Sequence, residues 1–408
     1  MREFKKHNSI GTEEIQVAKE VLESGILSGF VGEWGPHFYG GPWVQKLEDR
    51  AQSYFGVRHA ISFNSWTSGL VAAVGALDIE PGDEVIVTPW TMSATAMAIL
   101  HWNAIPIFAD IDEETFCLNL KSVESQITPR TRAIMSADIL GQSADTEGLM
   151  ALGAKYNLKV ISDSAQAIGS TRNGKFTGSL TDFGGYSLNH HKHIHTGEGG
   201  ILVTNDDELA LRARLIRNHA ESVVGKAEVK NLTNMIGHNF RMTELEAAIG
   251  FTQLPKLEAI ILKRQYQASY LDYRLSQLPG LMVPKVSDGN SHVYYTYGLR
   301  IDPKIVKITK WELVEKLTNA GLPNVSPTFA NLHLLPIFQQ KTAYGTNGFP
   351  WSLEGVRKDI SYDKGICPIA EKLLDETFFQ FYVNDFDLTE EDLDFICRKF
   401  EEVWAQIF

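Results

Sequence analysis

Short apolar runs alternate with helically spaced apolar positions through the first half of the chain. Between about residues 58 and 205, a run of strand length is repeatedly followed by a helical pattern. The expected strands cover residues 60–63, 84–88, 105–109, 133–137 and 159–162, and the expected helices cover residues 67–78, 92–102 and 145–156. This alternation predicts βαβ units and a mostly parallel sheet, with ligands bound beyond the carboxyl ends of the strands.

The pattern differs at the N-terminus and in the second half of the chain. Helical patterns cover residues 12–23, 239–254, 255–278, 310–320 and 389–408, and a strand pattern covers residues 292–301. We therefore predict a large domain over residues 1–255 and a smaller C-terminal α+β domain over residues 256–408. Residues 339–366 are rich in Gly, Tyr, Asn and Trp and are expected to form an irregular insertion that serves recognition.

Composition narrows the possible classes of protein. The 408 residues are 44% hydrophobic, enough for a large core, and the formal net charge of −12 gives no general attraction to nucleic acid or anionic membrane. The three cysteines, Cys117, Cys367 and Cys397, are widely spaced, which indicates neither a disulfide framework nor a zinc site. The N-terminal sequence lacks the apolar core of a signal peptide, and a cytoplasmic protein is expected.

The segment from Gly184 to Gly200 carries a single lysine, Lys192, among histidines, hydroxyls and glycines just after an expected strand. A Schiff base requires a primary amine that can lose its proton, and burial or a nearby cation promotes that loss. Taken alone, Lys192 is also consistent with a solvated loop lysine. It is nevertheless a candidate for Schiff-base chemistry.

Two further elements point to the same ligand crevice. An apolar strand pattern ends at Asp163, which would hold a pyridine nitrogen protonated if the ligand were pyridoxal 5'-phosphate (PLP), with Gln166 beside the ring. The segment Asn64–Leu70 joins a strand to a helix, so its amides and hydroxyls form a candidate phosphate site. Separately, each element is an ordinary turn or helix cap, and their combination with Lys192 favours function.

In this order the three elements resemble the DegT/StrS-type nucleotide-sugar aminotransferases, a branch of the fold-type I PLP enzymes. The resemblance covers nearly the whole chain. Further matching stretches are Gly40–Val44, Thr95–Asp112, Gly237–Glu244 and Leu332–Pro336. The resemblance implies an α/β fold of the fold-type I aminotransferases, with a mostly parallel sheet of the seven-stranded type in the large domain.

The resemblance also implies the residue roles and the reaction. Lys192 is the Schiff-base lysine, Asp163 the partner of the pyridinium nitrogen and Gln166 the side chain beside the ring. The phosphate would be bound by Ser65, Trp66, Thr67 and Ser187, and Asn239 would reach the phosphate of the partner subunit in a homodimer with shared active sites. The implied reaction moves an amino group from L-glutamate, through pyridoxamine phosphate, to an oxo-sugar for amino-sugar and lipopolysaccharide or polysaccharide biosynthesis.

Several positions depart from the family pattern. Trp66 stands where a small glycine is usual in the phosphate turn. The residue that stacks on the cofactor ring is either Met92, where an aromatic is usual, or Trp90, and we favour Met92 although a thioether stacks less strongly. Asp138 and Leu140 replace a frequent histidine and tyrosine. The acceptor is expected to be nucleotide-linked, with a free sugar, an inositol or an 8-oxo long-chain acidic sugar left open.

Three alternatives to a PLP aminotransferase are a metal site, a PLP sugar dehydratase and a non-catalytic relative. His190, His191, His193 and His195 could suggest a metal site, but no carboxylate or cysteine set accompanies them at ligand spacing, so no metal is expected. A PLP sugar dehydratase is disfavoured because that lineage carries histidine at the position of Lys192. A non-catalytic regulatory relative is disfavoured because both the lysine and the aspartate are present.

Overall fold

Seven strands form the central sheet of this computed structural model, which describes residues 2–408. Their spatial order is β1 (His59–Phe63), β9 (Gly200–Thr204), β8 (Phe183–Ser187), β5 (Lys159–Asp163), β4 (Thr131–Ala137), β2 (Glu84–Val87) and β3 (Ile105–Phe108). The pairs from β8 through β3 are all parallel, and β9 runs antiparallel to both of its neighbours. The predicted α/β fold with a mostly parallel sheet is confirmed.

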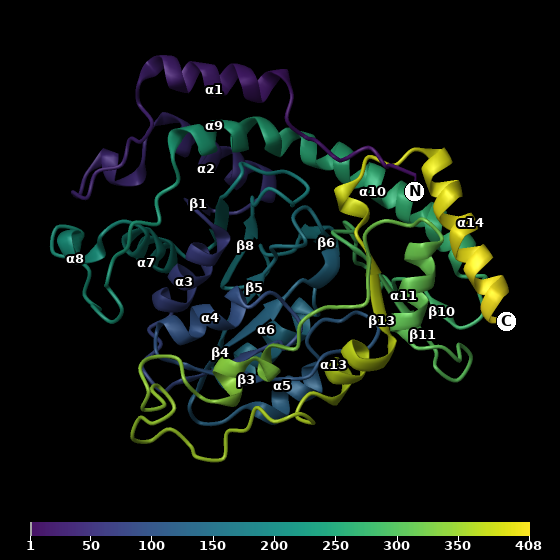
Figure 1. The fold of residues 1–408 in the computed structure, drawn as a ribbon. Helices are drawn as coiled ribbons and strands as arrows, with labels where there is room; N and C mark the ends of the chain where they lie inside the picture. Colours follow the sequence, from purple (N-terminus) through teal and green to yellow (C-terminus); the bar gives the residue numbers. More distant parts are fainter. Residues whose placement is uncertain (1) are drawn as a thin grey trace.

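Helices cover both faces of this sheet, whose central strands are buried along almost their whole length. α3 packs on β8 and β9, α2 on β1, and α6 on β4 and β5. The helices of this part are α1 (Thr12–Ser24), α2 (Pro42–Phe55), α3 (Trp66–Ala76), α4 (Ala94–His101), α5 (Leu120–Gln126), α6 (Thr146–Tyr156), α7 (Asp207–Arg217), α8 (Ala220–Val223) and α9 (Glu244–Gln253). Figure 1 shows α1 lying along α9 at the edge of the molecule.

A second, smaller sheet forms the other part of the molecule, at the right of Figure 1. Its antiparallel strands are β10 (Leu281–Met282), β11 (Tyr297–Ile301), β13 (Phe378–Phe381) and β12 (Val325–Ser326), and a separate hairpin is formed by β6 (Thr171–Arg172) and β7 (Lys175–Phe176). The helices after α9 in the chain are α10 (Leu257–Leu275), α11 (Lys310–Asn319), α12 (Pro336–Gln339), α13 (Pro368–Lys372) and α14 (Glu390–Ile407), of which α12 and α13 pack on the core of the large sheet. Both chain ends lie beside this sheet, where Phe4 joins its hydrophobic core.

Two segments of the second half return to the large sheet. The strand predicted over residues 292–301 starts at Tyr297, because the backbone at Val293 instead bonds to the carbonyl of Gly141 at 2.8 Å. The insertion expected over residues 339–366 packs on the edge of the sheet, where the Tyr362 hydroxyl donates to the carbonyl of Pro106 on β3 at 2.8 Å. It therefore has a packing role that its composition did not indicate.

The hydrophobic core follows the same division only in part. Leu332, Phe338 and Trp351 belong to the core cluster of the large sheet although they follow residue 255 in the chain. The domain boundary at residues 255 and 256 stays a prediction. Among residues 2–408, none of the helices has both the length and the apolar character needed to cross a membrane.

Candidate active site

The carboxyl ends of the central strands open onto one cavity, here called the strand-end cavity. β5 ends at Asp163, β8 ends at Ser187, and β1 leads through Asn64 into α3. Eight of the predicted site residues line this cavity, namely Ser65, Trp66, Thr67, Met92, Asp163, Gln166, Ser187 and Lys192. Parallel strands thus bring together side chains that lie more than a hundred residues apart.

Lys192 lies in the turn between β8 and β9 and is only 8% exposed. Its Nζ lies 4.3 Å from the centroid of the Tyr295 ring. Burial lowers the pKa of the Lys192 amine to about 8, and the negative charge of Asp163 opposes that shift. The lowered pKa raises the neutral fraction of this amine near neutral pH, as a nucleophilic lysine requires.

Asp163 is held from both sides. The hydroxyl of Thr95, on α4, donates to Oδ2 at 2.7 Å, and the indole Nε1 of Trp66 donates to Oδ1 at 2.7 Å. The residue is 6% exposed, and these donors compensate for burying its charge. The carboxylate is consequently fixed in one orientation at the cavity wall.

The turn before α3 presents an anion site. Ser65 is the N-cap of this helix, and its Oγ accepts the amide of Ser68 at 3.1 Å. The first amides of the helix have no partner within it, and together with the positive end of the helix dipole they attract a phosphate. Gly200 allows the close approach of β9, since a Cβ there would lie 2.6 Å from the backbone nitrogen of Trp66.

Two residues near the ring position are anchored by their own hydrogen bonds. The Oε1 of Gln166 accepts the amide of Leu140 at 2.9 Å, which fixes the side chain at the cavity wall. Asp138 also lines the cavity, and it accepts hydrogen bonds from Ser164, Thr177 and the amide of Ala144. Burial raises the pKa of Asp138, and these donors oppose the shift.

Met92 and Trp90, the two candidates for ring stacking, lie in different surroundings. Met92 lines the strand-end cavity and is 62% exposed. Trp90 is fully buried, with its ring stacked on Phe329 at a centroid distance of 4.9 Å. The structure therefore leaves Met92 as the candidate that can reach a ligand.

Asn239 is the predicted site residue that the strand-end cavity does not include. It lies in the loop before α9 and is exposed, and its Oδ1 accepts a hydrogen bond from Nε of Arg241 at 2.7 Å. A role within its own subunit's cavity is thus not supported by its position.

The four histidines near Lys192 divide into buried and exposed groups. His193 is fully buried, its Nε2 lies 2.7 Å from the carbonyl of Val293, and burial lowers its pKa to about 3. His190 and His191 are exposed, whereas His195 is half-buried. Across residues 2–408, no three histidine, cysteine or carboxylate side chains gather in a metal-binding group.

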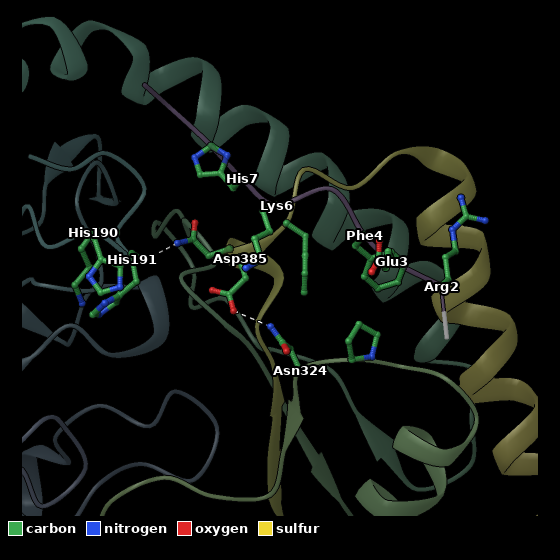
Figure 2. A pocket seen from close by; sticks show the side chains of 13 residues that line it. Arg2, Glu3, Phe4, Lys6, His7, His190, His191, Asn324 and Asp385 are labelled. Atoms are coloured by element: carbon green, nitrogen blue, oxygen red, sulfur yellow. Dashed lines mark hydrogen bonds between the residues drawn. The ribbon is translucent and has the colours of Figure 1, made fainter. Parts of the chain in front are cut away.

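A second and larger cavity of about 850 Å³ begins at Lys192, and we call it the interdomain cavity. Figure 2 shows His190 and His191 facing Asp385 across it, with the N-terminal segment that carries Lys6 and His7 along one side. That segment is held by backbone hydrogen bonds, from His7 to Asp385 at 2.9 Å and from Asp387 to Lys5 at 2.7 Å.

Sequence reasoning missed most residues of the interdomain cavity. Lys6, Asn324, Asn384 and Asp385 line it, yet none belongs to a motif with a chemical signature. The amide of Asn324 donates to Asp385 at 2.8 Å, and that of Asn384 donates to the carbonyl of His191 at 2.9 Å. Only the histidines beside Lys192 gave a signal in the sequence.

The residues of the strand-end cavity fit PLP. A buried amine with a lowered pKa matches its aldehyde, a fixed carboxylate matches its ring nitrogen, and a helix N-terminus with adjacent hydroxyls matches its phosphate. Each group stands at the wall of one cavity. The donor set thus provides for all three polar parts of the cofactor.

Comparisons with known proteins agree with this chemistry. A sequence profile of the DegT/DnrJ/EryC1/StrS aminotransferase family matches residues 8–376. The spore coat polysaccharide biosynthesis protein SpsC of Bacillus subtilis (strain 168) is 34% identical over 358 residues, which cover 86% of this chain and 89% of that protein. GDP-perosamine synthase of Caulobacter vibrioides is 34% identical over 297 residues, which cover 72% and 78%.

A solved structure extends the likeness to the fold. It is that of PseC from Helicobacter pylori, described as an aminotransferase involved in the biosynthesis of pseudoaminic acid. The TM-score is 0.80 at 26% identity, over 99% of this chain and 100% of that one. The predicted fold of the PLP aminotransferases is confirmed.

Proposed function

This chain belongs to the DegT/DnrJ/EryC1/StrS aminotransferase family, whose members depend on PLP, and we propose that it transfers an amino group from L-glutamate to a nucleotide-linked oxo-sugar. It is a PLP-dependent transaminase that serves amino-sugar biosynthesis. The residues of the interdomain cavity support the nucleotide-linked acceptor.

The observation that carries the proposal is the buried Lys192 amine at the junction of the two cavities. PLP, when bound, withdraws electrons from the carbon of the amino compound that loses its proton. Because the amine has a pKa of about 8, it can attack a carbonyl as the free base and then carry a proton between neighbouring atoms. Lys192 therefore serves as nucleophile and as general acid–base.

The other residues hold the cofactor rather than move protons. Asp163 provides a fixed negative charge for the ring nitrogen, and the side-chain donors Trp66 and Thr95 keep it in place. The amides at the start of α3, with Ser65, Thr67 and Ser187, bind the phosphate. Gln166 and Met92 pack at the ring.

The interdomain cavity is the proposed site of the acceptor. It starts at Lys192 and, at about 850 Å³, has room for a sugar with a further group attached. Asn324, Asn384 and Asp385 can form hydrogen bonds with sugar hydroxyls, and Lys6 offers a cation to a phosphate. Support for a nucleotide comes from GDP-perosamine synthase, whose name denotes a GDP-linked amino sugar.

A homodimer is also part of the proposal. Asn239 is exposed outside its own strand-end cavity, as a residue that serves a partner's site would be. The segment that includes α1 exposes several large apolar side chains, namely Ile15, Leu22, Ile26, Leu27 and Val31. Such a group of apolar side chains is typical of a protein interface.

We further propose a cytoplasmic location, since the three cysteines are buried free thiols.

Visible absorbance of the purified protein loaded with PLP tests the function. We expect a cofactor band that shifts on adding L-glutamate and returns on adding the right oxo-sugar from a panel of nucleotide-linked and free sugars. D-Glutamate is the matched control and should leave the band unchanged. If only free sugars, inositols or 8-oxo acidic sugars were accepted, the proposal of a nucleotide-linked acceptor would be wrong. If the protein could not bind PLP, the proposed enzymatic function would be wrong.

A further inference from the structure

The indole of Trp66 fills a space that exists because two neighbouring residues, Gly69 and Gly185, are glycines. A Cβ at Gly69 would lie 2.6 Å from the indole ring, and a Cβ at Gly185 would lie 2.2 Å from it. Contacts this short cannot be relieved by small shifts of a ring that is 4% exposed. The sequence of α3 and β8 thus leaves room for a large side chain at position 66.

Packing alone does not account for a tryptophan at this place. A phenylalanine would fill much of the same space, whereas only the indole brings an N–H to the carboxylate of Asp163. The Nε1 to Oδ1 distance is 2.7 Å, and the Thr95 hydroxyl donates to Oδ2 at the same distance. Oδ1 also accepts the backbone amide of Ala165 at 3.2 Å. Rotation of the carboxylate would break the shorter hydrogen bonds from Trp66 and Thr95.

We propose that Trp66 is a positioning residue, which holds the Asp163 carboxylate in the orientation that pairs with the ring nitrogen of PLP. This inference rests on the role of Asp163 in the proposed function. Trp66 acts through Asp163, and its backbone amide separately belongs to the phosphate turn. The side chain thereby connects the phosphate end of the site with the ring-nitrogen end through one residue.

The test compares two ligands that differ at the ring nitrogen. Apoprotein is titrated with PLP and with its 1-deaza analogue, in which a C–H replaces that nitrogen, and affinity is measured by equilibrium dialysis. Trp66→Phe removes the N–H and keeps an aromatic ring. We expect it to weaken PLP about tenfold, the effect of losing one hydrogen bond to a charged group, while the affinity for the analogue is unchanged.

Trp102→Phe is the matched control. The indole of Trp102 is also buried against α3, where its Nε1 donates to the carbonyl of Val71 at 2.7 Å and its ring lies against Gly75. Losing that N–H should leave the preference for PLP over the analogue as it is in the wild type. Trp66→Met is a second donor-free variant for the case that the phenylalanine variant does not fold, since methionine adapts to irregular space.

Three outcomes decide the inference. If either Trp66 variant loses affinity for PLP and not for the analogue, the inference is supported. If the affinity falls equally for both ligands, or for neither, Trp66 merely fills space and the inference is overturned. Asp163→Asn tests the role of Asp163 itself. If this variant did not lower the affinity for PLP more than the affinity for the analogue, Asp163 would not pair with the ring nitrogen, and the inference about Trp66 would be wrong as well. A protein that passes these binding tests and still aminates no oxo-sugar would lose the proposed function alone.

Discussion

The two cavities that meet at Lys192 are built in different ways. The strand-end cavity is made by one sheet, and its main groups are Asp163 at the end of β5, Ser187 at the end of β8 and the turn before α3. The interdomain cavity is made by the N-terminal segment, the turn at His190 and His191, and loops of the smaller sheet around Asn324 and Asp385.

The strand-end cavity has residues fixed by the core, whereas the interdomain cavity has residues that can be exchanged. In the strand-end cavity Asp163 is fixed by two donors that come from separate helices, so its geometry depends on the large core. In the interdomain cavity the exposed His190 and Lys6 can change without disturbing that core. We infer that the first cavity keeps the chemistry constant, while the second sets which acceptor is aminated.

Replacing Lys192 should have the largest effect, because this residue belongs to both cavities. We expect Lys192→Ala to lower amino transfer by roughly 10³-fold or more, since nucleophile and proton carrier are lost together. PLP should still bind without a covalent bond, held by Asp163 and the start of α3. Lys192→Arg should be as inactive, because a guanidinium does not deprotonate. Near-normal transfer by the alanine variant would contradict the assignment.

The same lysine should destabilise the apoprotein. Its pKa is about 8 in the fold and 10.5 when unperturbed, so folding disfavours the charged form below pH 8. The cost is full there and disappears as pH rises from 8 to 10.5. Lys192→Met should therefore raise the unfolding free energy by about 3 kcal/mol at pH 7 and by little at pH 10.5, measured by urea denaturation.

Lys310 is the matched control for that effect. It is also buried with its pKa lowered to about 8, but its ammonium donates to the carbonyls of Pro327 and Leu374. Lys310→Met would remove the same cost of burying a charge but would also leave these carbonyls without their donor, so at pH 7 it should raise stability by about 1–3 kcal/mol less than Lys192→Met does. If the two variants changed stability by the same amount, hydrogen bonding would not distinguish the two lysines.

The two cavities also differ in how far the sequence could predict them. Lys192, Asp163 and residues 65–67 follow strand patterns that are visible in the sequence, and a parallel sheet brings strand ends together. The contact between Trp66 and Asp163 was not predictable, because it depends on two glycines on different elements, Gly69 on α3 and Gly185 on β8. Lys6 and Asp385 meet through the path of the N-terminal segment, which no periodic pattern encodes. The packing of Trp351 and Tyr362 on the sheet edge was hidden by an irregular composition.

Two adjacent lysines sharpen the role of the interdomain cavity. Lys6 lines the cavity, whereas the ammonium of Lys5 lies 3.2 Å from Asp387, outside it. For a nucleotide-linked acceptor, Lys6→Ala should raise KM about two- to fivefold at low salt, the effect of losing an exposed cation near a phosphate, with kcat unchanged. Lys5→Ala should leave KM as it is. An equal rise in KM for an uncharged free sugar would show that Lys6 does not act through charge.

Met92 offers the smallest test, at the edge where the strand-end cavity meets solvent. Its side chain is 62% exposed, so packing on a bound ring would bury only part of it and contribute little. We expect Met92→Leu, which keeps the volume and removes the sulfur, to change PLP affinity by about twofold or less. Trp90→Phe is the comparison, because Trp90 lies in the core against Phe329 and should not affect PLP at all. Fluorescence titration of the apoprotein measures the PLP affinity of both variants. If the Trp90 variant lost more affinity than the Met92 variant, Trp90 would be the residue that stacks on the ring.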